Sequence, residues 1–289
     1  MNILVTGAEG FIGKKLVKSL KEAGHYVIMH CYADGDISQK DGLKRYEDRN
    51  IDVIYHLAAR TFVPDSWNYT YEYFQTNMMG TIAVLEFCRK QHCAAVLMST
   101  YVYGEPKFLP VSEKHPTVAI TPYHETKILL EDIGSFYADK FQIPVTVFRP
   151  FNVYGAGQNE NFLLPKIMKQ ILDESISEIR LMDLKPKRDY VYIDDVVEIM
   201  LCALQVKEGF NVYNIGTGKS YSVEEALNIC MDVTGIHKAY CATNEVRTQE
   251  VSDCVADMSK VSKAFNYEIK YSLPEGIRKW YEEIIKQEF

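Results

Sequence analysis

Short apolar runs alternate with amphipathic helical patterns through the first half of the chain, and this alternation constrains the fold more than any other feature. Four apolar, β-branched runs cover residues 2–6, 52–57, 94–98 and 144–149, and a weaker run covers 26–30. Between them, apolar residues recur at three- and four-residue spacing over 11–23, 69–91 and 123–141. This alternation predicts an α/β fold with a doubly wound parallel sheet, which binds ligands at the carboxyl ends of its strands.

After residue 155 the alternation becomes irregular. Helical patterns cover residues 162–173, 194–205, 222–234 and 273–286. Strand-like pieces cover residues 178–182, 210–215 and 239–242. We therefore expect one domain over residues 1–158 and about 183–216, and a smaller discontinuous part over 159–182 and 217–289.

Composition and charge exclude several classes of protein. With 289 residues, 47% of them hydrophobic and 25% charged, the chain has globular proportions. A net charge of −7 argues against nucleic-acid binding, which depends on many Lys and Arg contacts to phosphates. The most apolar stretch, 196–206, is too short to span a membrane, and the N-terminus lacks the pattern of a signal peptide. We expect a cytoplasmic protein with no membrane partner.

The cysteines predict neither a disulfide framework nor a metal site. There are seven of them, an odd number, and no two are spaced as Cys-x-x-Cys. Disulfide frameworks use even numbers of cysteines, and structural zinc sites use closely spaced pairs. We therefore expect no bound metal and interpret the cysteines mostly as small buried hydrophobic residues.

A glycine-rich loop joins the first predicted strand to the first predicted helix. Gly7 allows a tight turn, Gly10 lets the backbone approach a pyrophosphate, and Gly13 permits close packing of the helix on the strand. The helix N-terminus adds N–H donors and a positive dipole. A glycine-rich turn without a ligand is the alternative, but the order of strand, loop and helix favours a dinucleotide site.

The acidic residue that completes such a site is not clearly placed. It lies about 20 residues after the loop and binds the ribose hydroxyls of the adenosine. Counting along the chain indicates Asp34 or Asp36, whereas the register of the second strand indicates Cys31. Glu9 would repel the 2′-phosphate of NADP, but the missing acid at the strand end weakens the case for NAD. The choice between NAD and NADP therefore stays open.

Tyr123 and Lys127 lie four residues apart on one helical face. A tyrosine has an ordinary pKa of about 10, so an isolated phenol is a poor base at neutral pH. A positive charge about 4 Å away, at an effective dielectric constant of about 20, favours the phenolate by about 4 kcal/mol, or roughly three pKa units. Ser99 and Thr100 follow the buried run 94–98, where such a sheet presents catalytic groups. The pattern predicts an acid/base tyrosine.

The chain resembles the extended short-chain dehydrogenases/reductases that modify nucleotide sugars, among them 4-epimerases, 4,6-dehydratases and 4-ketoreductases. Beyond the glycine loop and the Tyr123–Lys127 pair, the matching motifs are HLAA at 56–59, NMMGT at 77–81, STYVYG at 99–104, RPFNVYG at 149–155, RDYVY at 188–192 and NIGTG at 214–218. The resemblance covers nearly the whole chain. It implies a Rossmann-type NAD(P)-binding domain over 1–158 and about 183–216, with a nucleotide-sugar-binding part over 159–182 and 217–289.

The resemblance also implies the roles of the catalytic residues. Ser99, three residues before Val102, would hydrogen-bond the reacting sugar oxygen, and Thr100 is the second candidate for this contact. Tyr123 would be the acid/base. Lys127 would hold the nicotinamide ribose and lower the pKa of Tyr123.

Binding residues follow from the same positions. The implied cofactor contacts, in addition to Tyr123 and Lys127, are Gly7, Gly10, Phe11, Ile12, Gly13, Asp36, Ile37, Leu57, Ala58, Ala59 and Pro150. The implied substrate contacts, in addition to Ser99 and Thr100, are Asn152, Arg188, Arg247 and Glu250. Asp36 and Ile37 would lie near the adenine. Asn152 and the two arginines would bind the nucleotide diphosphate, and Glu250 the nucleotide's ribose. Exposed salt bridges are the alternative for both arginines.

Departures from the family pattern narrow the reaction. Family dehydratases carry an acidic pair directly after the catalytic hydroxyl, whereas this chain has Thr100 and Tyr101 there. We therefore expect chemistry at the sugar's C4 without dehydration. The short segment 31–51 and the missing strand-end acid favour an exchangeable cofactor, so the sequence predicts a 4-ketoreductase of a nucleotide-linked 4-keto sugar. An NAD-retaining 4-epimerase is the first alternative, and a non-catalytic NAD(P)-binding sensor is the second. A homodimer through residues 69–91 and 123–141 is expected from the family.

Overall fold

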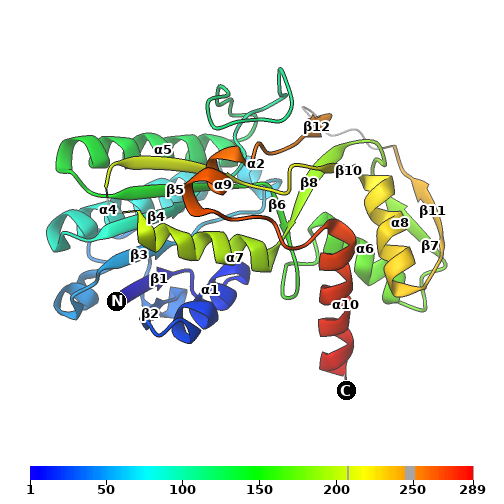
Figure 1. The fold of residues 1–289 in the computed structure, drawn as a ribbon, viewed down its shortest axis with the longest axis horizontal. Helices are drawn as coiled ribbons and strands as arrows, with labels where there is room; N and C mark the ends of the chain where they lie inside the picture. Colours follow the sequence, from blue (N-terminus) through cyan, green and yellow to red (C-terminus); the bar gives the residue numbers. More distant parts are fainter. Residues whose placement is uncertain (207, 245–250, 289) are drawn as a thin grey trace. The chain divides into compact units, whose positions relative to one another are not determined.

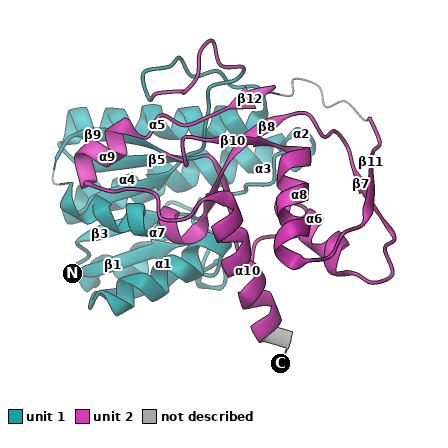
Figure 2. Ribbon diagram, turned by 45° about the vertical axis from the view of Figure 1, so that its right-hand side comes forward, with its two compact units in different colours: residues 1–104, 113–150, 197–214 teal, residues 105–112, 151–196, 215–289 magenta. Residues whose placement is uncertain are grey.

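The computed structural model describes residues 1–206, 208–244 and 251–288. These divide into two compact units, shown in teal and magenta in Figure 2. Unit 1 comprises 1–104, 113–150 and 197–214, and unit 2 comprises 105–112, 151–196 and 215–289. The structure thus assigns 105–112, 151–158 and 183–196 to unit 2, whereas the sequence analysis expected them in the first domain.

Unit 1 is built on a six-stranded sheet with the strand order β2-β1-β3-β4-β5-β9. The strands are β1 (Asn2–Thr6), β2 (Tyr26–His30), β3 (Val53–His56), β4 (Ala94–Met98), β5 (Val145–Pro150) and β9 (Phe210–Ile215). The first five pair in parallel. The interiors of β1, β3, β4 and β5 are apolar and buried, as expected for strands covered on both faces, whereas the edge strand β2 is partly exposed. The predicted doubly wound parallel sheet is confirmed, with strand ends within one residue of the predicted ones.

Helices cover both faces of this sheet. They are α1 (Phe11–Glu22), α2 (Asp65–Asn68), α3 (Thr70–Phe74), α4 (Gly80–Gln91), α5 (Pro122–Phe141) and α7 (Ile193–Cys202), which crosses the boundary between the units. α4 and α5 lie on one face, and α1 and α7 lie on the other (Figure 1). The main core forms between α4, α5 and the sheet, where Leu85 and Leu130 pack with Ile54 and Leu97. Burying such a side chain contributes about 1.5–3 kcal/mol.

The predicted helix over 69–91 is interrupted by a turn of π-helix, η3 (Gln75–Met79). Asn77 lies in this turn and is almost completely buried. Its side chain accepts a hydrogen bond from the Arg60 backbone N–H at 2.8 Å, and it donates to the Arg60 carbonyl at 3.1 Å and to Thr126 Oγ1 at 3.0 Å. The wider turn therefore lets one amide side chain fasten the segment after β3 to α5.

Unit 2 contains two small sheets. One has the order β10 (Ser220–Ser222), β8 (Lys187–Tyr192) and β12 (Asp253–Cys254), with β6 (Asn152–Tyr154) also paired to β8; the other joins β11 (Ala239–Ala242) to β7 (Glu178–Leu181). Its helices are α6 (Leu163–Leu172), α8 (Val223–Thr234), α9 (Ser259–Phe265) and α10 (Leu273–Glu288). The sequence analysis found β7, β11, α6, α8 and α10, but missed the sheet around β8. No helix in the described residues has the length and apolar character of a membrane span.

Asp189 organises the region around β8. It is fully buried and accepts hydrogen bonds from Thr217 N and Oγ1 at 2.7 Å each, from Gly218 N at 3.0 Å and from Ala256 N at 3.1 Å. Burial raises the pKa of this carboxyl, and the four hydrogen bonds oppose that shift. One carboxylate thus ties β8 to two separate loops of unit 2.

We expect Asp189→Asn to destabilise unit 2. An amide has one acceptor oxygen instead of two, so buried N–H donors lose their partner at a cost of about 1–3 kcal/mol. Urea unfolding followed by tryptophan fluorescence measures the change, with Asp232→Asn, at an exposed position of α8, as the matched control. Equal unfolding midpoints for the two variants would contradict the role given to Asp189.

Candidate active site

The glycine loop between β1 and α1 has the geometry of a pyrophosphate cradle. Gly7 has a φ of +67°, and a Cβ there would lie 2.7 Å from the Ala58 backbone nitrogen. A Cβ at Gly13 would lie 2.2 Å from the Gly7 carbonyl oxygen. Gly10 is the N-cap of α1 and offers no side-chain cap, so the N–H groups of the first turn can bind an anion. The loop therefore fits a dinucleotide, with backbone donors where a pyrophosphate would lie.

Two carboxylates gather around the end of β2, where the sequence predicts an acid but has Cys31. The Cys31 N–H donates to Asp34 Oδ2 at 3.0 Å, and Asp34 also pairs with Arg45 at 2.9 Å. Burial raises the pKa of the Cys31 thiol, and the neighbouring carboxylates of Glu9 and Asp34 raise it further. The structure thus brings negative charge to the strand end from the glycine loop and from the turn that follows β2.

Asp36 and Ile37 follow in the same connection. Asp36 accepts hydrogen bonds from Ser38 N at 2.9 Å and Ser38 Oγ at 2.8 Å, which lower the pKa of its carboxyl. Ile37 is buried, and its side chain lies against Gly80 at the start of α4. Asp36 therefore stabilises its own turn, and the contact of this pair with an adenine stays a prediction.

The other predicted cofactor residues lie at the ends of β3 and β5, the two strands on either side of β4. Leu57, Ala58 and Ala59 follow β3, and the Ala58 N–H donates to Thr6 Oγ1 at 3.2 Å. Pro150 is buried at the end of β5. These residues share the carboxyl edge of the sheet with the glycine loop, which is where doubly wound folds bind ligands.

Tyr123 and Lys127 lie in the first two turns of α5, which begins at Pro122 after the N-cap Thr121. Both side chains are buried, and Lys127 Nζ lies 5.8 Å from the centre of the Tyr123 ring. Nζ donates a hydrogen bond to the Met98 carbonyl at 2.8 Å. Burial lowers the pKa of Lys127 to about 8, against the charge of Glu131, which raises it.

The pKa of Tyr123 moves in the direction opposite to the predicted one. Burial raises it above the ordinary value, and a hydrogen bond with the Thr100 side chain partly counteracts this shift. Lys127 does not reverse this shift; its ammonium lies 5.8 Å from the centre of the Tyr123 ring and donates to the Met98 carbonyl. Burial is therefore the main influence on the Tyr123 pKa in this structure, and the lowering of this pKa by Lys127 stays a prediction.

The two candidate hydroxyls after β4 have different partners. Ser99 is buried and donates from Oγ to Glu131 Oε1 at 2.5 Å, while its N–H donates to the Phe148 carbonyl. Thr100 is half-buried, and its side chain lowers the pKa of Tyr123. The structure therefore brings Thr100 to the tyrosine and directs Ser99 into the interior, although the spacing from Val102 favoured Ser99.

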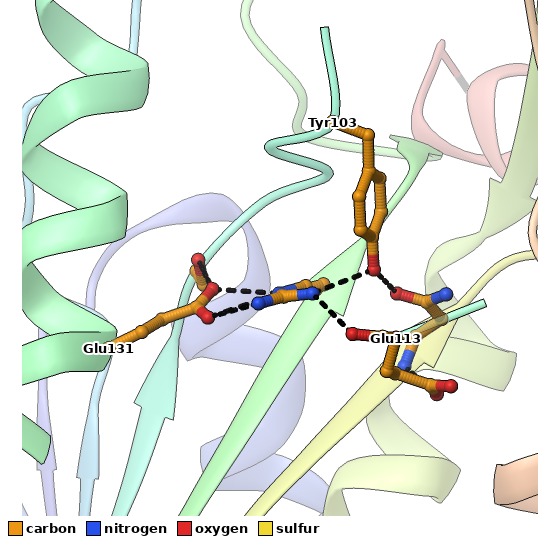
Figure 3. Close-up of polar contacts among 6 residues, drawn as sticks. Tyr103, Glu113 and Glu131 are labelled. Carbon is orange, nitrogen blue, oxygen red and sulfur yellow. Dashed lines mark hydrogen bonds and ion pairs between the residues drawn. The ribbon is translucent and has the colours of Figure 1, made fainter. Parts of the chain in front are cut away.

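A buried ion pair behind the tyrosine was not assigned a role by the sequence analysis. Arg149 at the end of β5 binds Glu131 on α5, and the same arginine donates to Tyr103 Oη at 2.9 Å (Figure 3). The signal available in the sequence was the position of Glu131, four residues after Lys127 and thus on the same helical face.

Apart from Ser99 and Thr100, the predicted substrate residues within the described ranges are Asn152 and Arg188, and both belong to unit 2. Asn152 Nδ2 donates to the Asp189 carbonyl at 3.3 Å, beside β8. Arg188 Nη1 donates to the carbonyls of Lys187 and Val251 at 2.7 Å each. Arg247 and Glu250 lie outside the described residues. The binding of a nucleotide diphosphate by these residues stays a prediction.

The carboxylates near Cys31 predict a preference for NAD over NADP. Glu9 and Asp34 suit the hydroxyls of an unmodified ribose, whereas a 2′-phosphate would meet negative charges at a cost of several kcal/mol. We expect isothermal titration to show at least about tenfold tighter binding of NAD. Glu9→Gln should strengthen NADP binding and leave NAD binding nearly unchanged, and Glu47→Gln, at an exposed position of η2 (Lys44–Arg49), is the control. Equal affinities in the unmodified protein would contradict this role of Glu9.

Comparisons with known proteins agree with this geometry. Residues 3–216 match the model of the NAD dependent epimerase/dehydratase family. A putative UDP-glucose 4-epimerase of Methanocaldococcus jannaschii is 30% identical over 96% of this chain and 96% of that protein. The structure of the Thermotoga maritima UDP-glucose 4-epimerase with UDP-glucose has a TM-score of 0.92 and 29% identity, and the match covers 100% of both chains. That of the Thermus thermophilus UDP-glucose 4-epimerase complexed with NAD has a TM-score of 0.90 and 26% identity over 99% of both chains.

These matches confirm the resemblance inferred from the motifs and the predicted fold class. They also confirm that the chain is an enzyme with an NAD(P) cofactor, in agreement with the cradle at Gly7 and Gly13. The chain belongs to the NAD dependent epimerase/dehydratase family.

Proposed function

We propose that the protein is an NAD-dependent nucleotide-sugar 4-epimerase that acts on a UDP-linked hexose. The observation that carries the proposal is the pairing of Tyr123 with Thr100 beside Lys127, in a chain that matches UDP-glucose 4-epimerases over nearly its whole length. The sequence analysis preferred a 4-ketoreductase and held the epimerase as its alternative. The relatives favour the alternative.

The main argument for the ketoreductase also loses its basis. It relied on the short segment 31–51, which lacks an acid at the end of β2 and thus suggested a weakly held cofactor. In the structure, Glu9 and Asp34 supply carboxylates at Cys31 from other positions. An adenosine ribose therefore has hydrogen-bond acceptors near the strand end, which supports retention of NAD between turnovers.

The proton transfers of the proposed reaction belong to the chain's own residues. The Tyr123 phenolate accepts the proton of the C4 hydroxyl and returns it once C4 has been reduced from the opposite face. Thr100, whose side chain lowers the pKa of Tyr123, is placed to bind the same sugar oxygen. We expect the Lys127 ammonium, which lies 5.8 Å from the centre of the Tyr123 ring, to favour the phenolate form against the effect of burial. A bound nicotinamide supplies the hydride acceptor and donor.

The products formed from UDP-glucose test the proposal. We expect conversion to the C4 epimer without net consumption of NAD, detected by proton NMR of the sugar. Tyr123→Phe should lower kcat by about 10²–10⁴-fold, because it removes the acid/base group. Tyr71→Phe, at an exposed position of α3, should have no effect.

Three other outcomes would contradict the epimerase. Oxidation of NADH or NADPH only in the presence of a 4-keto nucleotide sugar would establish the ketoreductase. A 4-keto-6-deoxy product would establish a dehydratase, which the lack of carboxylates at Thr100 and Tyr101 argues against. Cofactor binding without turnover of any nucleotide sugar would indicate a sensor.

We also propose Thr100, in place of Ser99, as the hydroxyl that binds the sugar oxygen. Thr100→Val keeps the shape of the side chain and removes the hydroxyl, so we expect kcat to fall by about 10²–10³-fold. Thr100→Ser keeps the hydroxyl and should retain most of the activity. Steady-state kinetics with UDP-glucose measure both variants. Full activity of Thr100→Val would return the role to Ser99.

The expected homodimer stays a proposal. Phe136 and Phe141 on α5 are exposed in the single chain, and they provide apolar area on the helix that the family resemblance places in the interface. Gel filtration of the purified protein decides between monomer and dimer.

A further inference from the structure

A buried polar network joins four elements of unit 1 (Figure 3). Arg149 Nε binds both oxygens of Glu131 at 2.9 and 3.1 Å, and Nη2 binds Oε2 at 2.5 Å. Arg149 Nη1 donates to Tyr103 Oη, which donates to Asn214 Oδ1 at 2.5 Å. Ser99 donates to Glu131 from the end of β4. The network therefore links β4, α5, β5 and β9 through hydrogen-bonded side chains.

Stability alone does not account for this ion pair. The residues Arg149 and Glu131 are only 5% and 6% exposed. Removing two charges from water costs several kcal/mol, so a buried pair adds little net stability compared with apolar residues of the same size. Breaking such a pair by neutralising one member is nevertheless strongly unfavourable. The ion pair therefore holds the connected segments in one geometry. Its location at the end of β4 and on α5 indicates what this geometry is for.

Ser99 connects the network to the proposed reacting groups through its two neighbours in the chain. Ser99 lies between Met98, whose carbonyl accepts the hydrogen bond of Lys127 Nζ, and Thr100, whose side chain lowers the pKa of Tyr123. Glu131 lies one helical turn after Lys127 on α5. The Ser99–Glu131 hydrogen bond therefore closes a ring that passes from α5 through the end of β4 and back to α5 through Lys127. A movement of the β4 end would displace Thr100 and the acceptor of Lys127 together.

The charges around Lys127 support the same assignment. Glu131 contributes a negative charge from the same helix, and it raises the pKa of Lys127 against burial. His56 of β3 also faces Lys127, but burial lowers its pKa to about 3, so its ring is neutral. The Tyr123 phenol is a further titratable neighbour. Among these groups, Glu131 carries the negative charge that keeps Lys127 protonated near neutral pH.

We propose that Ser99, Glu131 and Arg149 are positioning residues that hold the β4 end and α5 in register, so that Thr100, Tyr123 and the charged Lys127 face one reacting oxygen. The roles of Thr100 and Tyr123 rest on the proposed function. The position and charge of Lys127 do not, because they follow from the network itself.

The first experiment measures the titration of Lys127 by NMR with carbon-13 at the lysine Cε. In the unmodified protein one resonance, absent from Lys127→Arg, should titrate near pH 8. Glu131→Gln keeps the shape and removes the charge, so the midpoint should move to lower pH. Glu86→Gln, in the partly exposed pair with Arg89 on α4, is the matched control and should leave the midpoint in place. An unchanged midpoint in Glu131→Gln would overturn the electrostatic part of the proposal. This readout needs no turnover, so it stands even if the epimerase assignment fails.

The second experiment uses Ser99→Ala, which removes one oxygen without changing a charge and keeps the ion pair. We expect kcat with UDP-glucose to fall by about tenfold with little change in KM, as for a small misplacement of a catalytic group. The Lys127 midpoint should stay near pH 8, and the unfolding midpoint in urea should change little. If Ser99→Ala is as active as the unmodified protein, the positioning role of Ser99 is overturned. This test remains valid even if Glu131→Gln fails to fold. A shift of the alkaline limb of the kcat profile in Glu131→Gln, absent from Ser99→Ala, separates the charge of Glu131 from its tether to β4.

Discussion

Steric crowding at the glycine loop is the constraint on which the rest of unit 1 depends. The backbone at Gly7 touches the segment after β3, and the start of α1 touches the Gly7 carbonyl, with no room for a Cβ at Gly7 or Gly13. Because β1 lies between β2 and β3, this contact fixes the carboxyl ends of the central strands in one place. The positions of the cofactor cradle and of the proposed catalytic helix both depend on that edge of the sheet. The geometry of the site therefore depends on these backbone contacts as well as on its side chains.

Much of unit 1 was predictable because local pattern and tertiary role agree there. The strands β1, β3, β4 and β5 are apolar and buried on both faces, so their sequences are recognisable as strands. In unit 2, β8 carries Lys187, Arg188 and Asp189, and no apolar pattern reveals a strand whose buried aspartate accepts hydrogen bonds from distant loops. The domain boundaries were hidden for the same reason, since segments of unit 2 are defined by pairing with β8.

The candidate site shows a sharper limit of sequence reasoning. The motif at 99–104 placed two hydroxyls side by side, and spacing from Val102 favoured Ser99. Which one faces Tyr123 depends on the direction of the chain as it leaves β4, and on the buried Glu131 that binds Ser99. Likewise, the spacing of Tyr123 and Lys127 predicts proximity, but burial decides the direction of the Tyr123 pKa. Cys31 illustrates the converse, because carboxylates at other positions of the sequence supply the charge that its own position lacks.

The π-helical turn between α3 and α4 limits the deletions that this protein can tolerate. Each residue of an α-helix rotates the chain by about 100°, and the wide turn contains one residue more than an α-helical turn requires. α3 and α4 therefore follow nearly the same axis, but their faces differ by a rotation of about 100°. A deletion of one residue within Gln75–Met79 would restore regular helix and rotate the buried face of α4 away from the sheet. The length of this segment is thus as strictly constrained as the identity of Asn77, although most of its side chains contribute little to the core.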